Sequence, residues 1–217
     1  MRSEVHPVMP QRIGVLGGTF NPIHHGHLLM AQELAEAARL DTVLLVPSRV
    51  PPHKPAEDLA PERDRLEMVR LAAAENPLFQ ASDRELRRPG VSYTVVTLRE
   101  LRAELPPDTE MFFLIGADSL PDLAKWKEPR EIVALAQVLT ATRPGFSFDR
   151  LAELSGSFPP SGLDGLRRGL TETTPVGISS TEVRRRVRLG RSLRYLVPPP
   201  VAGYIRDRRL YLSDHDP

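Results

Sequence analysis

Two histidines follow a glycine turn near the start of the chain, in the segment GGTFNPIHHGH at residues 17–27. Gly17 and Gly18 carry no Cβ, so the backbone there can turn sharply and approach a bulky anion. His24 and His27 are one helical turn apart, which lets both imidazoles face one ligand if a helix begins here. The N-terminus of that helix would add free N–H groups and the positive end of the helix dipole. The segment therefore predicts a phosphate-binding site with two imidazoles beside it.

Two other interpretations of this segment compete with phosphate binding. A glycine turn after a strand is often only a βα loop, but such a loop does not require Thr, Pro and two His at fixed spacing. Two histidines can also be metal ligands, although zinc needs a third and a fourth ligand. The chain has no cysteine, and the first carboxylate after the histidines is Glu33. We therefore expect no metal site formed by the protein here.

A second candidate anion site lies at residues 178–186, ISSTEVRRR. Ser179 and the glutamate three residues later match the capping box that starts a helix. Arg184 lies within two turns of that helix N-terminus, close to free N–H groups and two serine hydroxyls, a combination that favours phosphate. Arg185 and Arg186 point to other sides of the helix, where an arginine is usually solvated.

Three further candidates lie in loops. Lys54 belongs to a rigid, basic loop that follows an expected strand, and it is either a phosphate contact or a solvated lysine. Asp118 also follows a strand and either binds a ribose or adenine edge or forms an Asx-turn or helix cap. Trp126 lies between two lysines, so we expect it to be at least half exposed and able to stack on a flat ring.

Apolar periodicity predicts the elements that would position these residues. Continuous apolar runs predict buried parallel strands, and ligands bind at the carboxyl ends of such strands. We expect an α/β fold, a Rossmann-like open parallel sheet with helices on both faces and a small helical C-terminal part. Residues 1–11 form a tail and residues 12–217 one domain, of which residues 179–217 are the C-terminal part. Strands are expected at residues 13–16, 42–46, 79–82, 110–115 and 137–141, and helices at 26–38, 61–75, 95–105 with Ser92 as N-cap, 132–136, 148–154, 163–170 and after 179.

Composition narrows the class of protein. The length of 217 residues suits one α/β domain. The chain has 29 basic and 28 acidic residues, and this near balance argues against a dedicated nucleic-acid binder. No apolar run approaches the length of a membrane span, and residues 1–10 contain no secretory h-region. We expect a cytoplasmic enzyme without a membrane or nucleic-acid partner, and the sequence leaves homo-oligomer formation open.

Five separated segments resemble one family, the bacterial nicotinate-nucleotide adenylyltransferases of the nucleotidyltransferase superfamily with an H-x-G-H motif. The segments are GGTFNPIHHGH, PPHK, SYT, GADS with the downstream Trp126, and ISSTEVR. The chain departs from the family pattern in three places. Asn21 stands where many relatives have Asp, Lys127 follows the tryptophan, and the Gly/Pro-rich stretch at residues 145–172 looks longer than the family minimum. These differences concern fine specificity rather than reaction class.

The resemblance implies adenylyl transfer from ATP to nicotinate mononucleotide, which gives nicotinate adenine dinucleotide and pyrophosphate in NAD biosynthesis. Mg²⁺ would accompany ATP. The implied catalytic residues are His24, His27 and Arg184, and Lys54, Thr94, Trp126 and Lys127 would bind the mononucleotide. The implied ATP contacts are Gly17, Gly18, Thr19, Phe20, His24, His27, Gly116, Asp118, Ser119, Ile178, Ser179, Ser180 and Arg184. The alternatives are a related adenylyltransferase for nicotinamide mononucleotide or phosphopantetheine, and a nucleotide sensor without turnover.

Overall fold

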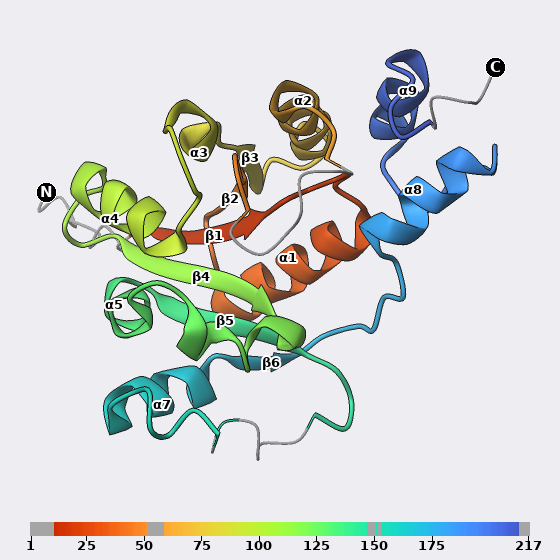
Figure 1. The fold of residues 1–217 in the computed structure, drawn as a ribbon. Coiled ribbons are helices and arrows are strands. Elements are labelled where there is room, and N and C mark those ends of the chain that lie inside the picture. The colour runs from red at the N-terminus through yellow and green to blue at the C-terminus, as the bar shows by residue number, and fades with distance from the viewer. Residues whose placement is uncertain (1–10, 52–58, 147–150, 152, 213–217) are drawn as a thin grey trace, which may run out of the picture.

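The computed structural model describes residues 11–51, 59–146, 151 and 153–212, and the structural statements below refer to these residues. Six parallel strands form one open sheet in the order β3-β2-β1-β4-β5-β6 (Figure 1). The strands are β1 Arg12–Gly18, β2 Thr42–Pro47, β3 Phe79–Ala81, β4 Glu110–Gly116, β5 Gln137–Thr142 and β6 Leu170–Glu172. The helices are α1 His25–Ala38, α2 Glu62–Ala73, α3 Arg84–Arg87, α4 Thr94–Glu104, α5 Pro129–Leu135, α7 Pro160–Arg168, α8 Ser180–Arg188 and α9 Pro199–Asp207, with 3₁₀ turns η2 Ala117–Ser119 and η3 Leu123–Lys125.

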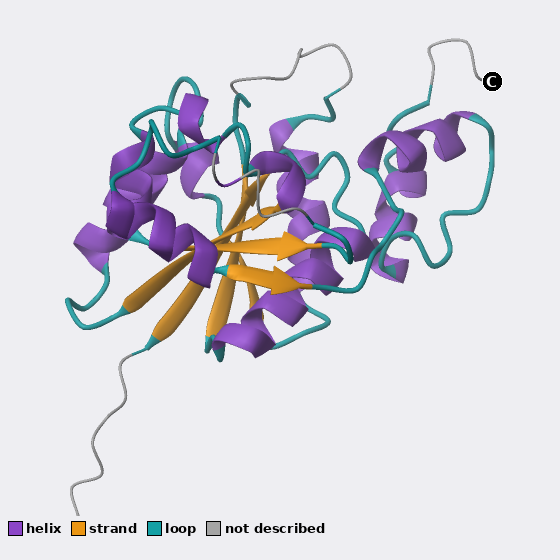
Figure 2. Ribbon diagram, turned by 90° about the horizontal axis from the view of Figure 1, so that it is seen from below, coloured by secondary structure: helices purple, strands orange, loops and turns teal. Residues whose placement is uncertain are grey.

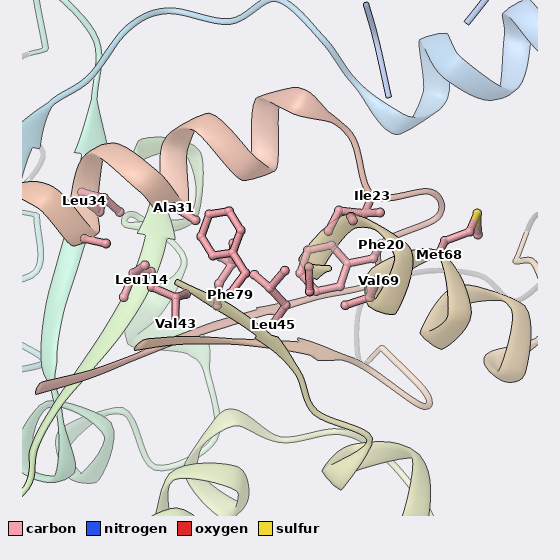
Figure 3. Packing of buried hydrophobic residues seen from close by; sticks show 14 of the residues in the cluster. Phe20, Ile23, Ala31, Leu34, Val43, Leu45, Met68, Val69, Phe79 and Leu114 are labelled. Atoms are coloured by element: carbon pink, nitrogen blue, oxygen red, sulfur yellow. The ribbon is translucent and has the colours of Figure 1, made fainter. Parts of the chain in front are cut away.

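Helices cover both faces of the sheet, as the sequence predicts (Figure 2). Successive strand residues point to opposite faces. Leu16, Leu45 and Leu114 pack with α1 and α2 on one face, whereas Val15 and Phe113 pack with α4, α5 and α7 on the other. Figure 3 shows the first of these layers, formed by Phe20, Ile23, Ala31, Leu34, Val43, Leu45, Met68, Val69, Phe79 and Leu114.

The sheet reverses its winding direction beside β1. This strand pairs with β2 on one side and with β4 on the other, while the chain runs outward from it in both directions. Such a switch point opens a crevice at the carboxyl ends of the two neighbouring strands. The turns after β1, β2 and β4 all lie at this crevice. The ends of β1 and β4 and the turns after them carry the predicted site residues Gly17, Gly18, Thr19, Phe20, His24, Gly116, Asp118 and Ser119.

The C-terminal part lies beyond the N-terminus of α1 (Figure 1). Helix α9 packs against α2, and the Tyr204 hydroxyl donates a 2.7 Å hydrogen bond to Asp64 on that helix. The His25 backbone N–H donates to the Leu196 carbonyl at 2.9 Å, which ties the start of α1 to the segment between α8 and α9. No helix in the described ranges combines the length and apolar character needed to cross a bilayer.

The structure corrects two of the expected elements. Ser92 is not the N-cap of α4, because its Oγ accepts a 2.9 Å hydrogen bond from the Arg49 N–H and the helix starts after Tyr93 instead. The helix expected at residues 163–170 ends at Arg168 instead, and residues 170–172 form the edge strand β6, which the sequence patterns do not predict. Residues 1–10 of the expected tail, and most of the helix expected at 148–154, lie outside the described residues.

Candidate active site

The end of β1 leaves open space beside Gly17 but not beside Gly18. A Cβ on Gly18 would lie 3.1 Å from the Phe20 ring, so a side chain at this position would crowd that ring. A Cβ on Gly17 would meet no atom within 4 Å among the described residues. Phe20 itself is 2% exposed and adopts a positive φ of 46° as the chain turns toward α1. The backbone at Gly17 therefore faces a space that a ligand can enter.

His24 and His27 form a stacked pair at the start of α1. Their ring centroids are 3.7 Å apart, with an interplanar angle of 20°. The His24 backbone N–H donates to Nδ1 of His27 at 3.3 Å, so the proton of a neutral His27 ring is on Nε2. The Phe20 ring packs edge-on against His27 at 5.2 Å. His27 therefore presents a fixed Nε2–H donor.

Burial keeps His24 neutral. Its side chain is 5% exposed, and loss of solvation lowers its pKa from 6.5 to about 4, with a small contribution from the nearby His25. A Cβ on Gly26 would lie 3.1 Å from Nδ1 of His24 and 3.4 Å from the Ile178 carbonyl, which explains the glycine inside the H-x-G-H motif. The neutral imidazole can take up charge when a phosphate arrives.

Acid should weaken folding through His24. The unfolded chain binds a proton there below about pH 6.5, whereas the folded chain binds it only near pH 4, so stability is full above 6.5 and falls as the pH drops between these values. Between about pH 7 and pH 4.5 we expect the wild-type protein to lose about 2 kcal/mol more than a His24→Asn variant. Urea unfolding at each pH measures the difference. Parallel pH curves for the two proteins would contradict a depressed His24 pKa.

Arg184 is the member of the arginine cluster that faces the turn. Helix α8 begins at the predicted cap, since Ser179 Oγ accepts a 3.1 Å hydrogen bond from the Glu182 N–H. One turn on, Arg184 Nη1 donates to the Asn21 carbonyl at 2.9 Å. Arg185 instead forms an exposed pair with Glu182.

The N-terminus of α8 also contacts the turn that precedes α1. Ser180 Oγ donates to the Pro22 carbonyl at 2.9 Å. Ile178, Ser179 and Ser180 therefore lie beside the segment that carries the histidines, although they are more than 150 residues away in the sequence. Two helix N-termini, an imidazole pair and a guanidinium meet at one place.

The turn at the carboxyl end of β4 contains Gly116, Asp118 and Ser119. Because β4 pairs with β1, this turn lies next to the one that follows β1. Asp118 is exposed, and Nη2 of Arg143 lies 3.9 Å from its carboxylate. The role of this turn in adenine or ribose binding stays a prediction.

A pocket of about 530 Å³ lies beside the glycine turn. It has the size of a small-molecule site. Trp126 meets Phe113 edge-on at 5.8 Å and is only partly exposed, so the expectation that it is at least half exposed is wrong. The Lys127 ammonium lies 4.6 Å from the centre of the Tyr93 ring. The pocket is lined by Gly17, Gly18, Thr19, Ser48, Pro51, Glu85, Ser92, Tyr93, Thr94, Phe113, Lys125, Trp126, Lys127 and Ile132.

Two predictions fall outside what the structure tests. Lys54 lies outside the described residues. No group of three or more His, Asp or Glu side chains in the described ranges is arranged to hold a metal ion. The expectation that the protein itself forms no metal site stays a prediction.

Sequence reasoning missed two buried charged residues at this site. Arg65 is 1% exposed and donates to backbone carbonyls of the turns after β1 and β2. Glu85 is 6% exposed in the pocket wall, where Thr97 Oγ1 donates to it at 2.6 Å and burial raises its pKa. The burial of Arg65 could have been inferred from its spacing, because it lies three and four residues before Met68 and Val69, which belong to the apolar stripe of α2. Glu85 offered no such signal.

Comparison with known proteins identifies the family of the chain. The cytidylyltransferase-like family model matches residues 15–186. A protein of Geobacter metallireducens named "Probable nicotinate-nucleotide adenylyltransferase" is 46% identical over 94% of this chain and 99% of its own length. A protein of the same name from Acidothermus cellulolyticus is 43% identical over 92% and 94%.

Two solved structures share the fold. Plasmodium falciparum nicotinic acid mononucleotide adenylyltransferase complexed with NaAD has a TM-score of 0.71 and 19% identity, and covers 93% of this chain and 97% of that one. The same enzyme complexed with APC gives a TM-score of 0.70 at 18% identity, with the same coverage. With 42–46% identity to relatives along nearly their whole length, the chain belongs to the cytidylyltransferase-like family and, within it, to the nicotinate-nucleotide adenylyltransferases.

Proposed function

We propose that this protein transfers the adenylyl group of ATP to nicotinate mononucleotide and releases pyrophosphate. One observation carries the proposal: Gly17, Gly18 and Thr19 belong both to the turn that leads to the two histidines and to the wall of the aromatic pocket. A mononucleotide in the pocket would direct its phosphate toward this shared turn. The imidazole pair and Arg184 adjoin the same turn without lining the pocket, and the triphosphate of ATP would bind beside them.

The chemistry follows from these groups. A phosphate oxygen of the mononucleotide attacks the α-phosphorus of ATP, the bond from that phosphorus to the bridging oxygen breaks, and pyrophosphate leaves. The attacking phosphate is ionised at neutral pH, so the reaction needs no general base. The protein has to hold two anions in line and stabilise the developing charge. His27 Nε2–H, the neutral His24 and the Arg184 guanidinium are suited to that task.

Mg²⁺ is part of the same proposal. It would accompany the triphosphate and be held mainly by phosphate oxygens and water. Asp118 is an exposed residue just after β4, and its carboxylate is a type of ligand that Mg²⁺ accepts. A cytoplasmic location, and action on small nucleotides rather than nucleic acid, also belong to the proposal.

The relatives support the choice of substrate. The proteins that are 42–46% identical to this chain are named for nicotinate nucleotide, and one solved structure of the same fold is described as a complex with NaAD. The pocket gives a physical reason for the acid form, because Thr94 is the first residue of α4 and the N–H groups of a helix N-terminus suit a carboxylate.

The deciding assay is pyrophosphate release from ATP with nicotinate mononucleotide, nicotinamide mononucleotide and phosphopantetheine in parallel. We expect the acid mononucleotide to give at least a roughly tenfold higher kcat/KM than the amide, because donors alone satisfy a carboxylate but face the amide NH₂ unfavourably. A preference for the amide would reject this substrate and leave adenylyl transfer standing. ATP binding without pyrophosphate release would favour a sensor.

Replacing Trp126 by alanine should raise KM for either mononucleotide about tenfold, because stacking on an aromatic ring contributes about 1–3 kcal/mol per base. The ratio of acid to amide kcat/KM should stay nearly the same, since a ring face cannot tell the two apart. KM for ATP should not change. Trp126→Phe is the matched control, because it keeps a ring beside Phe113. An unchanged mononucleotide KM in Trp126→Ala would place the pyridine ring elsewhere.

A further inference from the structure

Arg65 is a buried cation whose hydrogen bonds all go to backbone carbonyls. It lies in α2 with 1% of its surface exposed. Its acceptors are the carbonyl oxygens of Ala60 at 3.1 Å, Thr19 at 2.9 Å, Ser48 at 2.6 Å and Arg49 at 3.2 Å. Burial lowers the pKa of the guanidinium, and Glu62 only partly offsets this effect.

Three of those carbonyls belong to two different turns of the crevice, and the fourth, that of Ala60, lies just before α2. Thr19 follows β1 in the turn that leads to the two histidines. Ser48 and Arg49 follow β2, in the loop whose next residues lead to Lys54. The Ser48 N–H also donates to the Gly18 carbonyl at 2.9 Å, so the two turns already touch, and the guanidinium spans them from the side of α2.

The chemistry of arginine explains why this residue type is used. A guanidinium has five donors in a rigid planar fork, whereas a lysine ammonium is a single flexible point. A buried charge is weak evidence for stability, because a packed apolar residue usually stabilises a core at least as well. Arg65 lies on the buried side of α2 with the apolar residues Met68 and Val69. Its retention there is better explained by the geometry that it imposes on the two turns.

We infer that Arg65 is a positioning residue that fixes the distance between the turn after β1 and the turn after β2. The inference rests on the proposed function, in which the turn after β1 lies between ATP and the mononucleotide and the turn after β2 lines the mononucleotide pocket. In-line attack depends on the relative placement of two anions, and a displacement of about 1 Å can cost about a hundredfold in rate. Arg65 would act on the rate of transfer without touching either substrate.

The test compares Arg65→Lys and Arg65→Gln with Arg70→Lys. Arg70 lies on the same helix, is exposed and pairs with Glu67, so its variant controls for changes in α2 itself. We expect both Arg65 variants to lower kcat at least about tenfold well below their melting temperatures, because reactant alignment is lost. The dissociation constant of each substrate, measured alone, should stay within about threefold of wild type, since neither contacts Arg65. Arg70→Lys should behave like wild type.

Amide hydrogen exchange provides a readout that needs no turnover. In both Arg65 variants, peptides covering residues 17–24 and 44–51 should exchange faster, and in Arg70→Lys they should not. A kcat that falls only with the folded fraction, or matches Arg70→Lys, would overturn the positioning role. If the wild-type protein released no pyrophosphate, the proposed function would fail, while unchanged exchange at the two turns would separately reject the link through Arg65.

Discussion

Replacing His24 or His27 by alanine should lower kcat by about 10²–10³ and change KM for ATP little. The rings are stacked at 3.7 Å, and the hydrogen bond from the His24 N–H to His27 Nδ1 fixes where the His27 proton lies. Such preorganised donors contribute most where charge develops in the transition state, so their removal affects turnover more than binding. Steady-state kinetics of both variants with saturating mononucleotide measures the effect.

His25 provides the control within the same turn. It lies between the two other histidines in sequence, but its side chain lines a separate hollow of about 850 Å³ bordered by α8 and α9. His25→Ala removes an imidazole from the same helix start and should leave kcat close to wild type. Turnover near that of wild type in His24→Ala or His27→Ala would refute the catalytic assignment of that residue. An equal loss in all three variants would indicate damage to the helix start instead.

Local sequence patterns predict the strands at the centre of the sheet. The apolar runs at β2 and β4 are continuous because both faces of these strands are covered, which makes them recognisable without tertiary information. Strand β6 is three residues long, lies at the edge and has no apolar run. A Cβ on Gly169, just before it, would lie 1.8 Å from the Val138 carbonyl. That close approach to β5 is a tertiary constraint that no local pattern contains.

The candidate site likewise contains residues that local sequence patterns predict and residues that they do not. Glycines, histidines and the Ser179 cap can be read from spacing, because a turn and the first turn of a helix are local structures. Arg65 was missed because its partners lie 5 to 46 residues away in sequence, and an arginine on a helix is normally solvated. The exposure of Trp126 was misjudged because two exposed lysine neighbours do not determine the direction of a ring in a turn.

Arg184→Ala should lower kcat about a hundredfold or more, whereas Arg185→Ala and Arg186→Ala should have little effect. Hydrogen bonds from arginine to phosphate are charge-assisted and about twice as strong as neutral ones. Arg184 points at the turn between β1 and α1, where Nη1 meets the Asn21 carbonyl. Pyrophosphate should also inhibit the Arg184 variant less strongly, because it would bind the same cation. Initial rates and the pyrophosphate inhibition constant measure both effects.

The neighbouring arginines separate a phosphate contact from a general loss of positive charge. Arg185 pairs with Glu182 on the exposed side of α8, and Arg186 donates to the Ser192 carbonyl. Arg185→Ala and Arg186→Ala each remove one positive charge from α8, as Arg184→Ala does. A long-range electrostatic effect would therefore lower the activity of all three variants. Arg184 also supports the Asn21 carbonyl, and a purely structural role would lower the melting temperature while leaving pyrophosphate inhibition unchanged. Activity close to that of wild type in all three variants would refute the phosphate contact of Arg184.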